Sequence, residues 1–181
     1  MARKYRLEPE GEGLYRVIAV RDFKTSRGQS PEVKEGDRGG LVSGPYNLSQ
    51  RGRCWIEEGA KVIDQAKVLK DGLVMENAIV SGRAVVTDLS WVAGSAQVQD
   101  NAQIQEGGAV LDRAIVRDGA TVRSAGIVGG QAVVEHRARV EDGAMVGDKT
   151  QVGGNAVISG QDTVITGDRY IIKGVTKTET A

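Results

Sequence analysis

An aliphatic residue stands at every sixth position of this chain from Ile56 to Val164, and this period restricts the fold more than any short motif does. Two positions before each aliphatic residue lies a second column of mostly small residues, which runs from Cys54 to Asp162. A six-residue period fits neither an α-helix, which repeats every 3.6 residues, nor a long strand, which repeats every two. It fits short strands that each place two side chains inward and are joined by tight turns, as in a solenoid. The sequence therefore predicts an all-β fold in which Val164 points inward and no hexad carries an insertion.

The period divides the chain into three parts. We expect residues 54–168 to form the repeat domain, residues 1–53 to form an N-terminal β capping segment, and residues 169–181 to form a C-terminal cap with a frayed tail. Within the first part, Leu14–Phe23 is a strand-like run that is followed by a polar loop up to Gly40.

Several strings of the sequence carry a resemblance to a known family. VIAVRDF, VKEGDRGGLV and NLSQRGRCWI before the first hexads, and EHRARVEDGAMVGDK over residues 135–149, resemble the hexapeptide-repeat YdcK proteins, including members encoded by phages and prophages. The resemblance covers nearly the whole chain. It implies a left-handed parallel β-helix in which three hexapeptides make one triangular coil, so that the 108 residues from Ile56 to Val164 give six coils of eighteen. It also implies an acyltransferase-type fold, although a fold alone does not establish a reaction.

His136, the one histidine of the chain, is the first candidate for catalysis. In acyltransferases of this fold the general base is a histidine, so the resemblance makes His136 the candidate base of an acetyl-CoA- or other acyl-CoA-dependent transferase. Asp118 stands eighteen residues earlier at the same corner and is expected to orient the imidazole. Gly154, one coil later, leaves space for a ligand, with Glu135 and Arg137 at its rim. The competing interpretation is a solvent-exposed turn histidine paired with a neighbouring acid.

Two features argue against catalysis. The uninterrupted hexads leave no projecting loop or extra helix from which to build a substrate pocket. Carbonic anhydrases of this fold use three histidine ligands on zinc, which a chain with one histidine cannot supply. We therefore expect no metal site and no required cofactor. Cys54 falls in a small inward slot and is expected to be a buried filler.

The outward strand positions on one predicted face are apolar and point to association. That stripe consists of Trp55, Leu73, Trp91, Ala109, Ile127, Met145 and Thr163. An apolar strip with aromatic anchors is typical of a subunit interface, and proteins of this fold are commonly trimers, so a homotrimer is predicted. The alternative is that the N-terminal segment covers this face.

The charge and hydropathy of the sequence limit the kinds of partner that we expect. The chain carries 24 basic and 24 acidic residues, and residues 1–53 hold 11 of the basic and 7 of the acidic ones. This basic end lacks interleaved stacking aromatics, so we do not expect a nucleic-acid surface, and no apolar run is long enough for a membrane span. A cytoplasmic protein of a bacterial or phage-infected cell is predicted.

The leading functional prediction is a non-catalytic oligomeric β-helix that binds a protein partner or small ligand in its subunit grooves, as a phage or prophage accessory or counter-defence protein. The acyl-CoA-dependent transferase is the first alternative. A structural or nucleic-acid-associated protein is the second.

Overall fold

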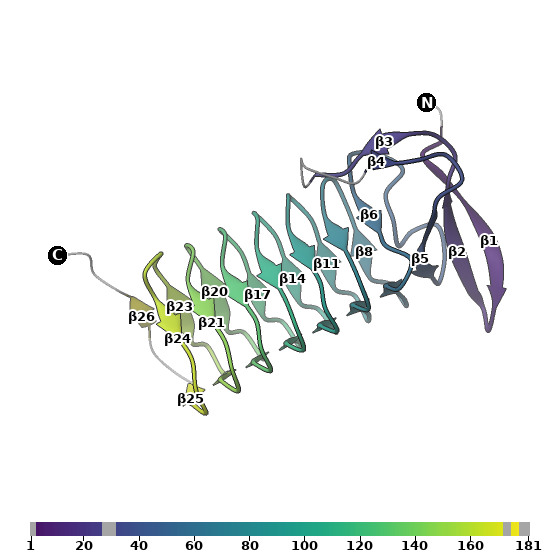
Figure 1. Cartoon of the computed structure of the whole chain (residues 1–181). Coiled ribbons are helices and arrows are strands. Elements are labelled where there is room, and N and C mark those ends of the chain that lie inside the picture. The colour runs from purple at the N-terminus through teal and green to yellow at the C-terminus, as the bar shows by residue number, and fades with distance from the viewer. Residues whose placement is uncertain (1–2, 27–31, 172–174, 178–181) are drawn as a thin grey trace.

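The computed structural model describes residues 3–26, 32–171 and 175–177, and this part of the chain is all-β, without a helix. Its strands stack into a parallel β-solenoid of about seven turns, capped at one end by antiparallel strands (Figure 1). No helix that could span a membrane is found among these residues. Of the predicted C-terminal cap and frayed tail at 169–181, residues 172–174 and 178–181 lie outside them.

Each turn of the solenoid contributes one short strand to each of three sheets. Face 1 contains β6 (Trp55–Ile56), β9 (Leu73–Val74), β12 (Trp91–Val92), β15 (Ala109–Val110), β18 (Ile127–Val128), β21 (Met145–Val146) and β24 (Val164–Ile165). Face 2 contains β7 (Lys61–Val62), β10 (Ile79–Val80), β13 (Gln97–Val98), β16 (Ile115–Val116), β19 (Val133–Val134), β22 (Gln151–Val152) and β25 (Tyr170–Ile171). Face 3 contains β8 (Lys67–Val68), β11 (Val85–Val86), β14 (Gln103–Ile104), β17 (Thr121–Val122), β20 (Arg139–Glu141), β23 (Val157–Ser159) and β26 (Val175–Lys177).

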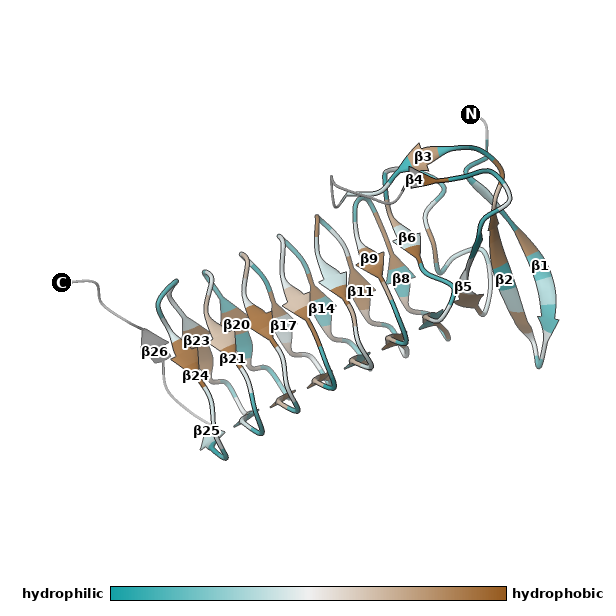
Figure 2. Ribbon diagram, viewed as in Figure 1, coloured by the Kyte–Doolittle hydropathy of each residue, from teal (hydrophilic) through white to brown (hydrophobic). Residues whose placement is uncertain are grey.

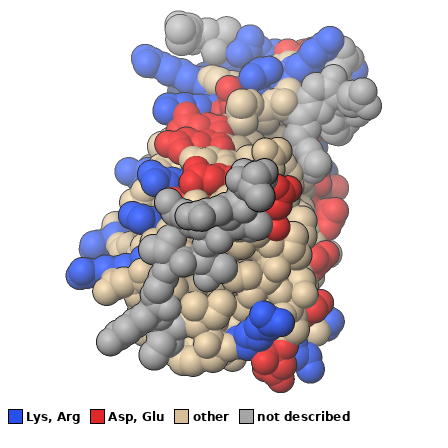
Figure 3. All heavy atoms as spheres, turned by 90° about the vertical axis from the view of Figure 1, so that its left-hand side faces the viewer, with Lys and Arg blue, Asp and Glu red and all other residues tan. Residues whose placement is uncertain are grey.

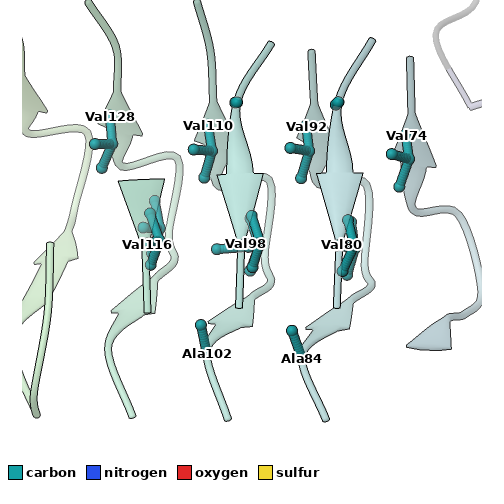
Figure 4. Packing of buried hydrophobic residues seen from close by; sticks show 14 of the residues in the cluster. Val74, Val80, Ala84, Val92, Val98, Ala102, Val110, Val116 and Val128 are labelled. Atoms are coloured by element: carbon teal, nitrogen blue, oxygen red, sulfur yellow. The ribbon is translucent and has the colours of Figure 1, made fainter. Parts of the chain in front are cut away.

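The stacking register is eighteen residues through most of the solenoid, as in the pairing of Trp91 with Ala109 and of Val133 with Gln151. From β6 to β24, the inward aliphatic residue of each strand and the small residue two positions before it are buried. Figure 4 shows the valines of successive turns in rows, with Val92 beside Val110 on face 1 and Val80 beside Val98 on face 2. Figure 2 shows the resulting alternation of hydrophobic strands and hydrophilic turns along the solenoid. Because each turn buries its apolar side chains against its neighbours, burial supplies the main stabilisation.

The register changes near the C-terminal end, where the offset is nineteen residues at β24 and β25 and eighteen again at β26. The first of these changes corrects the prediction of an inward Val164. Met145 pairs with Val164 and Val146 with Ile165, so the last hexad of face 1 has gained one residue. Val164 is 60% exposed, whereas Ile165 is only 5% exposed. The uninterrupted period would place the Asp162 carboxylate in a small inward slot, where an unpaired charge is costly. The extra residue leaves Asp162 exposed and buries Thr163, whose Oγ1 donates to Ser159 O at 2.8 Å.

The parallel stacking also continues past residue 168, the predicted end of the repeat domain. β25 pairs with β22, and β26 pairs with β23. These strands raise the predicted six coils to about seven turns.

The N-terminal segment covers the first turn. β1 (Tyr5–Gly11) and β2 (Leu14–Ala19) form an antiparallel hairpin, and β5 (Arg38–Val42) joins this hairpin to β7, so that all three extend face 2. β3 (Phe23–Lys24) pairs with β4 (Glu32–Val33) near the first strand of face 1.

Buried polar groups fasten this cap to the first turns. Lys4, which is fully buried, donates from Nζ to Cys54 O at 2.9 Å and to Cys54 Sγ at 3.2 Å. Asn47 donates from Nδ2 to the carbonyl oxygens of Asp64 and Ala66, and its Oδ1 accepts from Gly44 N. The backbone ends of the first turn are therefore satisfied by side chains of the cap.

Candidate functional site at the His136 corner

His136 lies where the chain turns from face 2 to face 3, at a corner repeated in every turn. Six stacked residues occupy this corner with positive φ angles between 56° and 68°: Asp64, Gly82, Asp100, Asp118, His136 and Gly154. This left-handed conformation suits glycine and aspartate and is tolerated by histidine. The corner therefore accounts for the local sequence without any catalytic role.

The corner side chains form a hydrogen-bond ladder along the solenoid. Asp64 Oδ2 accepts from Gly82 N at 3.0 Å, and Asp100 Oδ2 accepts from Asp118 N at 3.2 Å. Asp118 Oδ2 in turn accepts from His136 N at 2.9 Å. His136 continues the series, because its Nδ1 lies 3.4 Å from Gly154 N and accepts from it. Histidine thus takes the acceptor role that aspartate has in earlier turns.

This ladder changes the expected role of Asp118. The sequence predicts that its carboxylate orients the imidazole, but its hydrogen bond goes to the backbone N–H of His136 instead. Because Nδ1 accepts from Gly154, the proton of the neutral ring lies on Nε2. The side chain of His136 is 57% exposed, and no hydrogen bond among the described residues joins its ring to the Asp118 carboxylate.

Glu135 stands beside the imidazole and is held from the other side. Its side chain is only 10% exposed, and its Oε2 accepts from both Nε and Nη2 of Arg117, the former at 3.0 Å. This contact raises the pKa of the Arg117 guanidinium, chiefly through the hydrogen bond to Glu135. The other oxygen, Oε1, lies 3.7 Å from His136 Nδ1.

An open depression of about 460 Å³ borders this group of side chains. Its lining consists of Asp100, Asn101, Asp118, Gly119, His136 and Arg137. Arg137 is one of these lining residues, and Gly154 lies beside the imidazole. Gly153 also packs closely against the ring, because a Cβ there would lie 3.3 Å from His136 Nδ1. The site is a shallow polar surface rather than an enclosed pocket.

Face 1, the predicted association surface, divides into a covered and an open part. Trp55 and Leu73 are buried, and the ring of Phe23 contacts Trp55 edge-to-face with a centroid distance of 5.3 Å. The chain itself thus covers Trp55, as the alternative interpretation of this face predicts. Trp91 and Ile127 are half-buried.

Further down the same face, the apolar side chains are open. Met145 is 40% exposed and Val164 is more so. Leu111, Ile127, Met145 and Val146 contribute to the wall of a groove of about 320 Å³ at this end. In the view from the C-terminal end, basic side chains line the left edge and acidic ones the right edge, the two kinds meet near the top and the bottom, and uncharged surface fills much of the lower middle (Figure 3).

The sequence reasoning missed the Arg117–Glu135 ion pair, although a signal for it is present. The two residues are eighteen positions apart, as are Arg123 and Glu141, whose side chains also form an ion pair. Opposite charges at this offset lie directly above one another in successive turns.

Comparison of the chain with models of known protein families and with curated protein sequences finds no match. The resemblance to the YdcK proteins therefore stays a sequence-based prediction, while the parallel β-solenoid is established by the structure.

Proposed function

We propose that the chain is a non-catalytic solenoid that associates with itself through the open part of face 1. The grooves between subunits would bind a protein partner or a small ligand. The observation that carries this proposal is the run of Ile127, Met145 and Val164, which stays partly or largely exposed along one face. Contiguous apolar surface of this kind on a soluble protein marks an interaction site.

The contrast within face 1 supports this assignment. The first two apolar residues of the stripe are buried, whereas those near the C-terminal end are open and border the groove beside Leu111. A second copy can cover only the open part, so the proposed interface centres on Ile127 and Met145 rather than on Trp55 and Leu73. A homotrimer is the proposed assembly, because a three-sided solenoid can place one face of each copy around a common axis.

Sedimentation velocity of the purified protein tests the proposal. Met145→Glu places a charge in the open part of face 1 and is expected to convert the trimer to monomers. Gln151→Glu is a matched control, because Gln151 is an exposed outward residue of the neighbouring strand on face 2. It should leave the trimer intact. A wild-type protein that is monomeric at micromolar concentration would contradict the proposal.

A second candidate is the acyl-CoA-dependent transferase, favoured by the depression beside the half-exposed imidazole of His136. Native mass spectrometry with acetyl-CoA separates the two candidates. Stoichiometric uptake of the coenzyme that His136→Asn abolishes would favour the transferase, whereas no uptake at millimolar concentration leaves the binding solenoid. From the family resemblance we place either activity in the bacterial cytoplasm, in an accessory role for a phage or prophage.

A further inference from the structure

The strongest unassigned feature is the meeting of three potential metal ligands at the His136 corner. Asp118, Glu135 and His136 each offer a ligand atom, and these atoms all lie within 4.8 Å of one another. The set combines one imidazole with two carboxylates. It differs from the three-histidine zinc site that the sequence reasoning rejected.

Two of the three side chains are held through one atom and keep another one free. Asp118 uses Oδ2 for the backbone of His136, and Glu135 uses Oε2 for Arg117. Among the described residues, no hydrogen bond reaches Asp118 Oδ1 or Glu135 Oε1, and His136 Nδ1 accepts only the long 3.4 Å bond from Gly154 N. Partners that fix the remaining atom of a ligand are typical of metal sites, because they orient the ligand before the ion binds.

Glu135 supplies a second observation, because its carboxylate is paired with Arg117 at one oxygen only. Its side chain is nine-tenths buried, and its free Oε1 lies 3.7 Å from His136 Nδ1. The single lone pair of that nitrogen accepts from Gly154 N over a long contact of 3.4 Å, which a bound ion would replace. The Arg117 guanidinium donates its hydrogen bonds only to the other oxygen of Glu135, Oε2.

We propose that Asp118, Glu135 and His136 bind a zinc-class divalent cation. Zinc accepts nitrogen and carboxylate ligands at about 2.0–2.2 Å in a tetrahedral arrangement, which places neighbouring ligands about 3.3 Å apart. Small side-chain rotations suffice to bring atoms within 4.8 Å to that separation. The adjoining depression leaves the fourth position open to water.

The ligand set favours zinc over the harder cations. Imidazole suits zinc, cobalt and nickel, whereas magnesium and calcium prefer sites made entirely of oxygen. Co²⁺ has the same geometric preference in such sites and absorbs visible light, so it serves as the probe. All three ligands come from one chain, and the site therefore does not depend on self-association.

The test is a titration of tag-free, chelator-treated protein with Zn²⁺ by calorimetry and with Co²⁺ by visible absorption. We expect one ion per chain and a cobalt band in the wild type. His136→Asn and Glu135→Gln should each weaken binding by at least about tenfold, the lower limit seen even for indirect partners of a metal. Asparagine tolerates the left-handed corner, so His136→Asn is expected to fold. Equal thermal unfolding temperatures would establish that it does.

Two control variants make the result specific. Glu141→Gln breaks the equivalent ion pair with Arg123 at the next corner, where no histidine is present, and should leave binding unchanged. Cys54→Ala removes the only thiol and should also leave it unchanged. Met145→Glu should retain one ion per chain even if the oligomer dissociates, which separates this proposal from the previous one.

Three results would overturn the proposal. The first is no heat and no cobalt band in the wild type at millimolar metal. The second is unchanged binding in both His136→Asn and Glu135→Gln. The third is an equal loss in Glu141→Gln, because it would trace binding to the general fold rather than to this corner.

Discussion

The inserted residue before β24 gives the most direct test of how the solenoid is built. Ile165→Ala and Val164→Ala remove apolar atoms from adjacent residues that point in opposite directions. Ile165 is almost fully buried, so the loss of three carbon atoms costs about 2.4 kcal/mol of transfer free energy at about 0.8 kcal/mol each, before any cavity is counted. Val164 is 60% exposed, and the loss of two carbon atoms that are less than half buried should cost about 0.6 kcal/mol.

Urea unfolding followed by circular dichroism measures both values. Because each turn of a solenoid contacts only its neighbours, the last turns can open separately from the rest. Hydrogen exchange of peptides that cover residues 160–171 therefore accompanies the urea curves. We expect faster exchange in Ile165→Ala than in Val164→Ala. The uninterrupted six-residue register predicts the reverse order, so a larger loss for Val164→Ala would refute the inserted residue.

Three further predictions concern the N-terminal cap. Burial raises the pKa of Tyr5 from 10.0 to about 12, so the folded state keeps the phenolic proton that the unfolded chain releases. The resulting stability is complete below about pH 10 and falls by up to about 3 kcal/mol as the pH rises to 12. Urea unfolding across this pH range measures the fall in stability. If stability falls with pH as steeply in Tyr5→Phe as in the wild type, Tyr5 is not its cause. Asn47→Ala leaves two buried backbone groups and one partly buried group unpaired and should cost about 3 kcal/mol in the same assay, so a loss below about 1 kcal/mol would show that water replaces the amide. Cys54 is buried, and burial raises the pKa of its thiol, so it should react with a disulfide reagent only after unfolding. Rapid labelling of the native protein would mean that the cap opens.

Most of the fold could be predicted from the sequence because two inward positions repeat with one period. The buried aliphatic column from Ile56 to Ile158 follows the predicted register. The predicted register is wrong at Asp162, because a count of aliphatic positions ignores the free-energy cost of burying a carboxylate. That cost was readable from the sequence, since Asp162 is the only charged residue in the small inward column.

The candidate site could be predicted only in part. The eighteen-residue offset places Asp118 beside His136, but it does not say which atoms meet. Whether a carboxylate bonds to the ring or to the backbone depends on the corner's left-handed backbone conformation, which turns the N–H of His136 toward the preceding turn. The division of face 1 was also beyond the repeat pattern. It depends on Phe23, which lies outside the hexads and reaches Trp55 only through the fold of the cap.

The hydrogen-bond ladder at the corner restricts the changes in length that preserve the surface of this solenoid. Removing or duplicating one hexad keeps every aliphatic residue inward, yet it moves all later outward residues to the next face. Met145 would then no longer lie on face 1 with Trp91, and each acceptor at the corner would lie beside a different backbone N–H. Only an insertion or deletion of eighteen residues preserves both the face of each outward residue and the hydrogen bonds at the corner. It changes the height of the solenoid by a single strand spacing of about 4.8 Å. A chain of this design can therefore lengthen or shorten by whole turns, and its outward side chains then stay on the same face.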